Sequence, residues 1–143
     1  MPVRDRLPTV LIVDDYRRVA DSLVVALQNN RFQACASYSA QDALSTADRQ
    51  QPEVAIIEVR LPDLDGVRLA RRIQVLSPRT DILLMSARPD ICGVETCEFE
   101  VLAKPMAPDE LIAKLRQRIA TGRERNHDLH AAREAGDLVK GGA

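Results

Sequence analysis

The sequence predicts an α/β fold in which helices cover both faces of a parallel β-sheet. Two patterns carry this prediction: short apolar runs alternate with helical patterns along the chain, and five such runs occur within 143 residues. Continuous apolar runs are typical of parallel strands buried on both faces, and strand–helix alternation favours right-handed crossovers. With 45% hydrophobic and 29% charged residues, the composition is that of one soluble domain with a proper core.

Each predicted strand is a short run rich in Val, Ile, Leu or Ala. The first is wholly apolar and stops at two aspartates, the second is weaker, and the third has Val54–Ile57 at its centre. The five predicted strands are Thr9–Val13, Phe32–Ser37, Glu53–Val59, Asp81–Met85 and Phe99–Ala103. Turn-forming residues separate these runs from the helical segments.

The predicted helices carry apolar residues at spacings of three and four, which is the period of one helix face. Ser39 precedes the second helix as an N-cap, and Asp65 precedes the third, which opens at Gly66. The predicted helices are Arg17–Gln28, Ala40 to about Arg49, Val67–Leu76 and Asp109–Ala120.

One interval breaks the alternation. The stretch between Ser86 and Phe99 is too short for a full crossover helix, and it carries Pro89 and Gly93. We expect a shortened or irregular fourth helix, or a loop, in this stretch.

Three parts of the chain differ in composition. We expect an N-terminal extension (1–8), one domain (9–121) and a charged C-terminal tail (122–143). The tail is predicted to be an extended helix or disordered, and we expect it to continue the last helix only briefly.

Charge and composition exclude several functions. The 20 Lys and Arg residues nearly balance the 21 Asp and Glu residues, so the net charge provides no general electrostatic attraction to nucleic acid or an anionic membrane. Aromatic residues make up only 3%, which argues against stacking on bases. No apolar run approaches the ~20 residues that cross a bilayer, and no signal-peptide pattern is present, so we expect a cytoplasmic protein.

Polar side chains gather where the predicted strands end. Asp14 and Asp15 follow the first strand, Glu58 ends the third, Ser86 follows the fourth and Lys104 follows the fifth. Ligands of open α/β sheets bind outside the carboxyl ends of the strands, so these groups are predicted to share one edge. Carboxylates suit a hard cation such as Mg²⁺, whereas a hydroxyl and an ammonium suit phosphoryl oxygens. Without a metal ion, the lysine would be the counter-ion of the carboxylates.

Four segments resemble, in this order, the receiver domain of two-component response regulators. They are Val10–Asp15, Val54–Gly66, Leu83–Ala87 and Leu102–Pro105, and the resemblance spans about 10 to 119. It implies a flavodoxin-like (βα)5 three-layer sandwich with a parallel sheet of strand order 2-1-3-4-5. It also implies that an acidic pair and a strand-three aspartate hold Mg²⁺, and that this aspartate accepts phosphate from a histidine kinase. A serine or threonine and a lysine then sense the phosphate.

Carried over residue by residue, the resemblance places Asp14 and Asp15 at the acidic pair, and Ser86 and Lys104 at the phosphate-sensing positions. Glu58 stands where the family has the phospho-acceptor aspartate. Its side chain is one methylene longer and would hold the carboxylate out of line for attack, so we expect no efficient phosphorylation. The implied metal ligands are the acidic pair and Glu58, and the longer side chain leaves Mg²⁺ binding open.

Two further departures concern the face that the family uses for partners or dimers. Val101 stands where the family often has an aromatic switch residue, and Phe99 lies on the same strand face. The interval from Ser86 to Lys104 is also about one helical turn, or roughly four residues, shorter than usual. We therefore expect an altered output face.

These features predict an atypical, stand-alone response regulator receiver in phosphorelay signal transduction. It would not be an enzyme, and it would act by protein–protein contact without phosphoryl transfer to Glu58. The expected partner is a histidine kinase or a downstream effector; no DNA-binding domain and no membrane are expected, and a homodimer is left open.

Two alternatives also stay open. One is a conventional receiver that takes phosphate from a histidine kinase in a Mg²⁺-dependent reaction. The other is a small Mg²⁺-dependent phosphotransferase or hydrolase. Glu58 itself has two interpretations: it mimics an aspartyl phosphate, or it closes a defunct site by pairing with Lys104.

Overall fold

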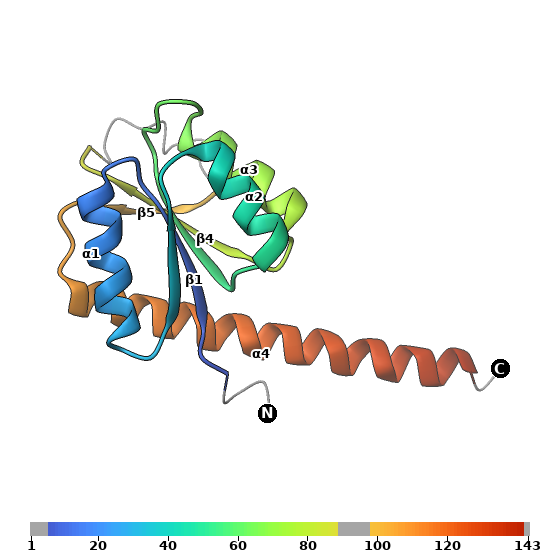
Figure 1. The fold of residues 1–143 in the computed structure, drawn as a ribbon. Helices are drawn as coiled ribbons and strands as arrows, with labels where there is room; N and C mark the ends of the chain where they lie inside the picture. The colour runs from blue at the N-terminus through green and yellow to red at the C-terminus, as the bar shows by residue number, and fades with distance from the viewer. Residues whose placement is uncertain (1–5, 89–97, 142–143) are drawn as a thin grey trace.

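Five parallel strands form one sheet in the computed structural model, which describes residues 6–88 and 98–141. Their order across the sheet is β2-β1-β3-β4-β5, which confirms the predicted order (Figure 1). The strands are β1 (Thr9–Val13), β2 (Gln33–Ser37), β3 (Val54–Glu58), β4 (Asp81–Ser86) and β5 (Glu100–Ala103). Each strand begins and ends within one residue of its predicted bounds.

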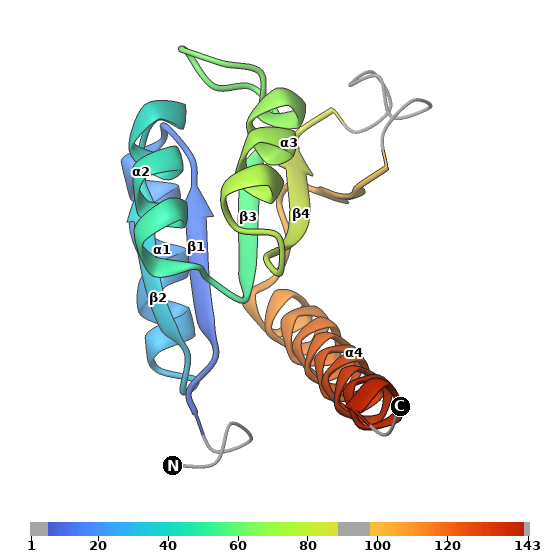
Figure 2. The same ribbon diagram turned by 90° about the vertical axis from the view of Figure 1, so that its right-hand side faces the viewer.

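Helices cover both faces of this sheet, as Figures 1 and 2 show from two sides. The helices are α1 (Arg17–Gln28), α2 (Ala40–Gln50), α3 (Gly66–Leu76) and α4 (Pro108–Gly141). One face packs against α1 and the first turns of α4, and the other packs against α2 and α3. The predicted three-layer sandwich is therefore confirmed.

Alternate residues of β1 serve the two apolar layers. Val10 and Ile12 pack on the side of α1 and α4, whereas Leu11 and Val13 pack on the side of α2 and α3. All four are buried. A strand with helices on both faces needs apolar side chains at every position, which explains the continuous apolar run in the sequence.

The predicted N-caps of α2 and α3 are confirmed. Ser39 Oγ accepts a hydrogen bond from the backbone N–H of Asp42 at 3.2 Å. Asp65 Oδ1 accepts from the backbone N–H groups of Val67 and Arg68 at 2.7 and 3.4 Å. Each cap satisfies donors that have no partner inside their own helix.

The last helix extends beyond the predicted range Asp109–Ala120, because α4 continues to Gly141 and projects away from the sheet (Figure 1). The tail is thus the extended helix, one of its two expected states, and it continues α4 for longer than the brief extension that we expected. The docked first turns supply the helical nucleus, and the tail that follows contains no proline, so the helix can continue without the cost of a new nucleus. Gly122 lies inside this helix, where glycine costs about 1 kcal/mol of stability relative to alanine.

Basic side chains of α4 pair with acids at or next to the amino-terminal ends of β3, β4 and β5. The pairs, with nitrogen–oxygen distances of 2.6, 2.6 and 2.8 Å, are Arg123–Glu53, Arg118–Asp81 and Lys114–Glu100. These pairs fix the direction in which the helix leaves the domain, at the edge of the sheet opposite the carboxyl ends of the strands.

The predicted irregular segment after β4 falls mainly on residues 89–97, which lie outside the described residues. Of the helices in the described ranges, none is both long and apolar enough to cross a bilayer.

Candidate functional site

Lys104 lies between two carboxylates at the carboxyl ends of the strands. Its Nζ donates a hydrogen bond to Asp14 Oδ2 at 2.6 Å and lies 2.6 Å from Glu58 Oε2. The lysine side chain is 21% exposed, and the Asp14 and Glu58 side chains are 6% and 12% exposed. The three residues form a largely buried ion triad, in which one cation faces two anions.

The two carboxylates of the triad are held differently. Asp14 Oδ1 also accepts the backbone N–H of Tyr16 at 3.0 Å, so both of its oxygens have partners. Glu58 Oε2 is buried, and no donor among the described residues meets it in hydrogen-bond geometry. Its contact with Lys104 is therefore an ion pair without a directed hydrogen bond, and this buried oxygen depends on the lysine charge.

The charge state of Lys104 follows from opposing effects. Burial disfavours the charged ammonium, but the hydrogen bond to Asp14 and the negative charges of Asp14 and Glu58 outweigh it, so the pKa of Lys104 lies above its ordinary value. The stability that this shift contributes is fully present below the unfolded value of about 10.4 and is lost as the pH rises through the folded value. The Lys104 ammonium is thus charged across the physiological range.

Strand register brings these side chains together. The ends of β1 and β3 are paired in register, so Asp14 and Glu58 stand at neighbouring strand ends. The ends of β4 and β5 are also in register, and the Lys104 N–H donates to the Ser86 carbonyl oxygen at 2.8 Å. The peptide bond between Lys104 and Pro105 is cis.

The other predicted residues lie near the triad without joining it. Asp15 is exposed, and within the described ranges its side chain has no hydrogen bond or ion pair. Ser86 is buried, and its Oγ accepts the backbone N–H of Arg88 at 3.0 Å. Val101 packs beside Phe99 on the α2–α3 side of the sheet, the shared face that the strand pattern predicted for both.

Gly66 determines how closely the chain after Glu58 can return to begin α3. Its N–H donates to the Val59 carbonyl oxygen at 2.7 Å. A Cβ atom at position 66 would lie 2.3 Å from the Glu58 carbonyl oxygen and 2.8 Å from Val59 Cα. Only glycine permits this approach of two backbone segments, so Gly66 shapes the backbone that carries Glu58.

Sequence reasoning missed the role of Asp63 in the loop that follows Glu58. Its carboxylate oxygens accept the backbone N–H groups of Ala40 and Gln41 at 3.0 and 3.1 Å, which ties this loop to the start of α2. The hydrogen bond from Ala40, together with the one from Gln41, lowers the pKa of Asp63. The cap spans 23 residues of sequence, so no local pattern signals it.

We expect Asp63→Asn to lower the free energy of unfolding at pH 7, because the amide keeps one acceptor and loses the charge that favours a helix N-terminus. Since the pKa of Asp63 is depressed in the folded state, its contribution is present above the unfolded value of about 3.9 and is lost as the pH falls through the lower folded value.

Urea midpoints measured across this range provide the test. The wild-type and variant midpoints should differ at pH 7 and converge as the pH falls below about 3.9. Asp48→Asn removes an exposed charge from the last turn of the same helix; it is the control and should be no less stable than the wild type at pH 7. A difference that persists in acid would contradict the assigned role of the charge.

The triad does not fit the Mg²⁺ ion that the resemblance implies. The expected ligands are Asp14, Asp15 and Glu58, but Lys104 Nζ lies between two of them and Asp15 is exposed. In residues 6–88 and 98–141, no three acidic, histidine or cysteine side chains form a group that could hold a metal ion. In this arrangement Lys104 supplies the positive charge that a metal ion would otherwise bring.

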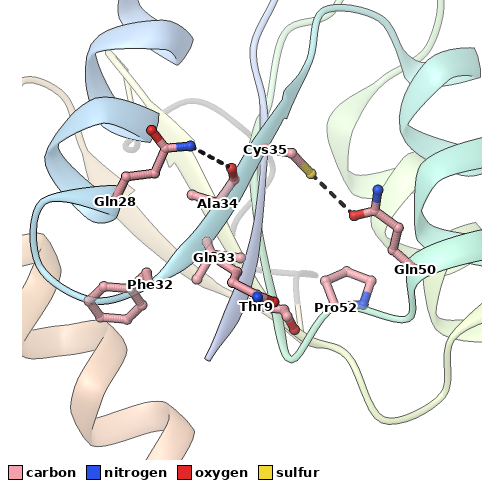
Figure 3. Close-up of a pocket in the computed structure, with 9 residues that line it drawn as sticks. Thr9, Gln28, Phe32, Gln33, Ala34, Cys35, Gln50 and Pro52 are labelled. Atoms are coloured by element: carbon pink, nitrogen blue, oxygen red, sulfur yellow. Dashed lines mark hydrogen bonds between the residues drawn. The ribbon is translucent and has the colours of Figure 1, made fainter. Parts of the chain in front are cut away.

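A separate pocket of about 300 Å³ lies beside β2, near the amino-terminal end of the sheet (Figure 3). Within it, Gln28 Nε2 donates to the Ala34 carbonyl oxygen at 3.5 Å, and the Cys35 thiol donates to Gln50 Oε1 at 3.4 Å. Burial raises the pKa of the Cys35 thiol, which therefore stays protonated. None of the described residues that line this pocket is acidic or basic, so we place the candidate site at the triad.

The strand order and the charged strand ends define a flavodoxin-like α/β domain, and comparison with known proteins identifies the family. The response regulator receiver domain family matches residues 10–116. The chain belongs to this family.

Two curated relatives illustrate the match. Transcriptional regulatory protein CreB of Escherichia coli (strain K12) is 34% identical over 112 residues, which are 76% of this chain and 49% of that protein. Response regulator MprA of Mycolicibacterium vanbaalenii is 30% identical over 120 residues, which are 81% of this chain and 50% of that protein. The chain spans about half the length of the curated relatives it matches.

Solved structures share the fold. The receiver domain of an HD domain-containing protein from Pseudomonas fluorescens Pf-5 has a TM-score of 0.77 at 25% identity, covering 85% of this chain and 93% of that one. A CheY-like receiver domain from Methanospirillum hungatei JF-1 has a TM-score of 0.75 at 20% identity, covering 83% and 98%. Receiver domains generally act as signalling modules that interact with histidine kinases, and they typically bind Mg²⁺ at their phosphorylation site.

Proposed function

We propose that this chain is an atypical receiver domain that signals through protein–protein contact, without phosphoryl transfer to residue 58. The assigned positions are Glu58 for the phospho-acceptor, Asp14 and Asp15 for the acidic pair, Ser86 and Lys104 for phosphate sensing, and Val101 for the switch. The observation that carries this proposal is the ion triad of Lys104 with Asp14 and Glu58. The partner is a histidine kinase or a downstream effector.

The contacts of Glu58 support this proposal. Phosphoryl transfer requires an acceptor carboxylate aligned with the phosphodonor and cations free to receive the phosphoryl oxygens. Glu58 instead lies 2.6 Å from Lys104, and Lys104 also holds Asp14. An incoming phosphoryl group would have to break both contacts at carboxylates that are largely buried.

The same contacts favour a closed site over a phosphate mimic. A mimic of the phosphorylated state would engage both the lysine and the serine hydroxyl that sense phosphate. Glu58 contacts Lys104, whereas the Ser86 hydroxyl accepts the Arg88 N–H. One carboxylate therefore reproduces one of the two contacts.

Intact-mass measurement after incubation with Mg²⁺ and acetyl phosphate tests the proposal. We expect no phosphate adduct on the wild-type chain and a Mg²⁺-dependent adduct on Glu58→Asp, because the shorter side chain withdraws from Lys104 and frees both groups. Glu53→Asp makes the same change at the other end of β3, where Glu53 pairs with Arg123, and should remain unmodified.

An adduct mapped to Glu58 in the wild-type chain would contradict the proposal and favour a conventional phosphorylated receiver. If Glu58→Asp is also unmodified, phosphorylation independence stands, and the site departs from the family at more than one residue.

A further inference from the structure

A groove lies where α4 leaves the domain (Figure 1). It has a volume of about 520 Å³ and lies between α4 and the turn that connects α3 to β4. Gly122, Arg125 and Asn126 are among the residues that line it from the helix, and Gln74 and Arg79 are among those of the opposite wall. The groove lies at the amino-terminal edge of the sheet, so it is separate from the ion triad at the carboxyl ends of the strands.

Four polar side chains of this groove have no partner within the described part of the chain. They are Gln74 and Arg79 on one wall and Arg125 and Asn126 on the other. None of them makes a hydrogen bond or an ion pair with a described residue. Each guanidinium offers five N–H donors and no acceptor, and each amide adds two donors and one acceptor oxygen. The groove is therefore rich in donors, and an occupant that satisfies them must supply acceptors.

The two guanidinium groups also leave the groove with a net positive charge. The one carboxylate among its described lining residues, Asp81, is neutralised, because Arg118 donates to both of its oxygens at 2.6 Å. Glu124 and Asp128 are the acids nearest to Arg125 along the helix, but neither lines the groove or pairs with this arginine. Guanidinium groups bind carboxylates and phosphates through paired N–H donors. Both walls would therefore attract an anionic occupant.

The rest of the lining favours an acidic peptide over a phosphorylated small molecule. The helix α3 ends at Leu76, between the lining residues Gln74 and Pro78, and the carbonyl end of a helix disfavours a dense negative charge. None of the described lining residues is aromatic, so a nucleotide base would have no ring on which to stack. Pro78 and Leu129 supply apolar surface instead, and Leu129 is 59% exposed. Separate carboxylates on either side of an aliphatic side chain match this lining.

Gly122 keeps the helix wall of the groove open. A Cβ atom added there would meet no heavy atom within 4 Å among the described residues, so the position faces open space. Glycine weakens a helix interior, and no close approach of described residues requires one here. The space that its missing side chain leaves is available to an aliphatic side chain of an occupant.

We propose that this groove binds an acidic segment of a partner protein. Carboxylates of the segment pair with Arg79 and Arg125, and an aliphatic side chain lies between them. That side chain contacts Leu129 and fills the space beside Gly122. This partner chemistry rests on the proposed function, in which the chain acts through protein–protein contact. The groove does not involve residue 58, so its binding is independent of the charge state and phosphorylation of the triad.

Fluorescence anisotropy of the full chain with a fluorescein-labelled peptide of repeating Glu-Leu-Glu sequence tests this proposal. We expect a dissociation constant of about 0.1 mM or tighter at low salt, and binding at least about 10-fold weaker for the matched Gln-Leu-Gln peptide. Arg79→Gln and Arg125→Gln should each weaken binding by about 5-fold, and their effects should multiply because they lie on opposite walls. Arg18→Gln is the matched control, because it removes the same charge from an exposed position on α1 and should bind like the wild type.

Gly122→Leu tests the shape of the groove without changing its charge. Leucine favours the helix and fills the space beside it, so this variant should keep or increase helicity in circular dichroism and bind the peptide at least about 10-fold more weakly. Glu58→Asp should bind the peptide like the wild type, which separates this result from the phosphorylation test.

No binding by the wild type, or binding that Arg79→Gln and Arg125→Gln leave unchanged, would overturn the proposal. Displacement of the labelled peptide by inorganic triphosphate at a lower concentration than by unlabelled peptide would assign the groove to a polyphosphate instead. A dimer in sedimentation equilibrium that both arginine substitutions dissociate would assign it to a second copy of the chain.

Discussion

Lys104→Met is expected to lower the free energy of unfolding at pH 7 by about 3 kcal/mol, because it leaves two largely buried carboxylates facing each other without a cation. Chemical denaturation in urea, extrapolated to water, measures this change. Lys114→Met is the matched control, since Lys114 pairs with Glu100 at side chains that are 33% and 35% exposed. Its effect should stay below about 1 kcal/mol.

A second substitution tests whether the penalty arises from the carboxylates. Adding Glu58→Gln to Lys104→Met removes one of the two unpaired charges, so the double variant should recover part of the lost stability. If Lys104→Met costs no more than Lys114→Met, the triad behaves as a surface ion pair and the closed-site account fails.

Gly66→Ala is expected to destabilise the protein by about 3 kcal/mol, because the new methyl group would clash with backbone atoms, which cannot rotate away as a flexible side chain can. The methyl carbon would lie 2.3 Å from the Glu58 carbonyl oxygen, so the start of α3 must move. Arg68→Ala changes an exposed side chain in the same helical turn and should alter stability by less than about 0.5 kcal/mol.

This displacement should also be visible at the site. Backbone amide chemical shifts of Glu58 and Val59 should change in Gly66→Ala, and those of α4 beyond Gly122 should not. Equal stability of Gly66→Ala and the wild type would show that the turn after β3 tolerates a side chain, contrary to the close approach described above.

The strands and their charged ends were predictable because the physics that forms them is local. A strand buried on both faces must be apolar throughout, so β1 is visible as a run that stops where Asp14 meets the sheet edge. Parallel strands then bring their carboxyl ends together whatever the details of packing. This reasoning was sufficient to nominate Asp14, Glu58 and Lys104 together.

The contacts that decide what the site can do were not predictable, since they join distant segments. Nothing around Asp63 indicates that it caps α2, and nothing around Asp15 indicates that its side chain stays outside the triad. The sequence left the tail after α4's predicted end open between an extended helix and disorder for a related reason. Residues after Gly122 look marginal as a separate helix, but they continue one that is already anchored by Arg118 and Arg123.

That anchoring has a mechanical consequence. Arg118 and Arg123 hold a stiff rod at a pivot on the domain, and about 27 Å of it extends beyond Arg123 at 1.5 Å per residue. A tilt of about 10° at the pivot would swing the far tip by roughly 5 Å. A small rearrangement that breaks the ion pair of Glu53 or Asp81 would therefore produce a large displacement of the helix end, because α4 acts as a lever arm.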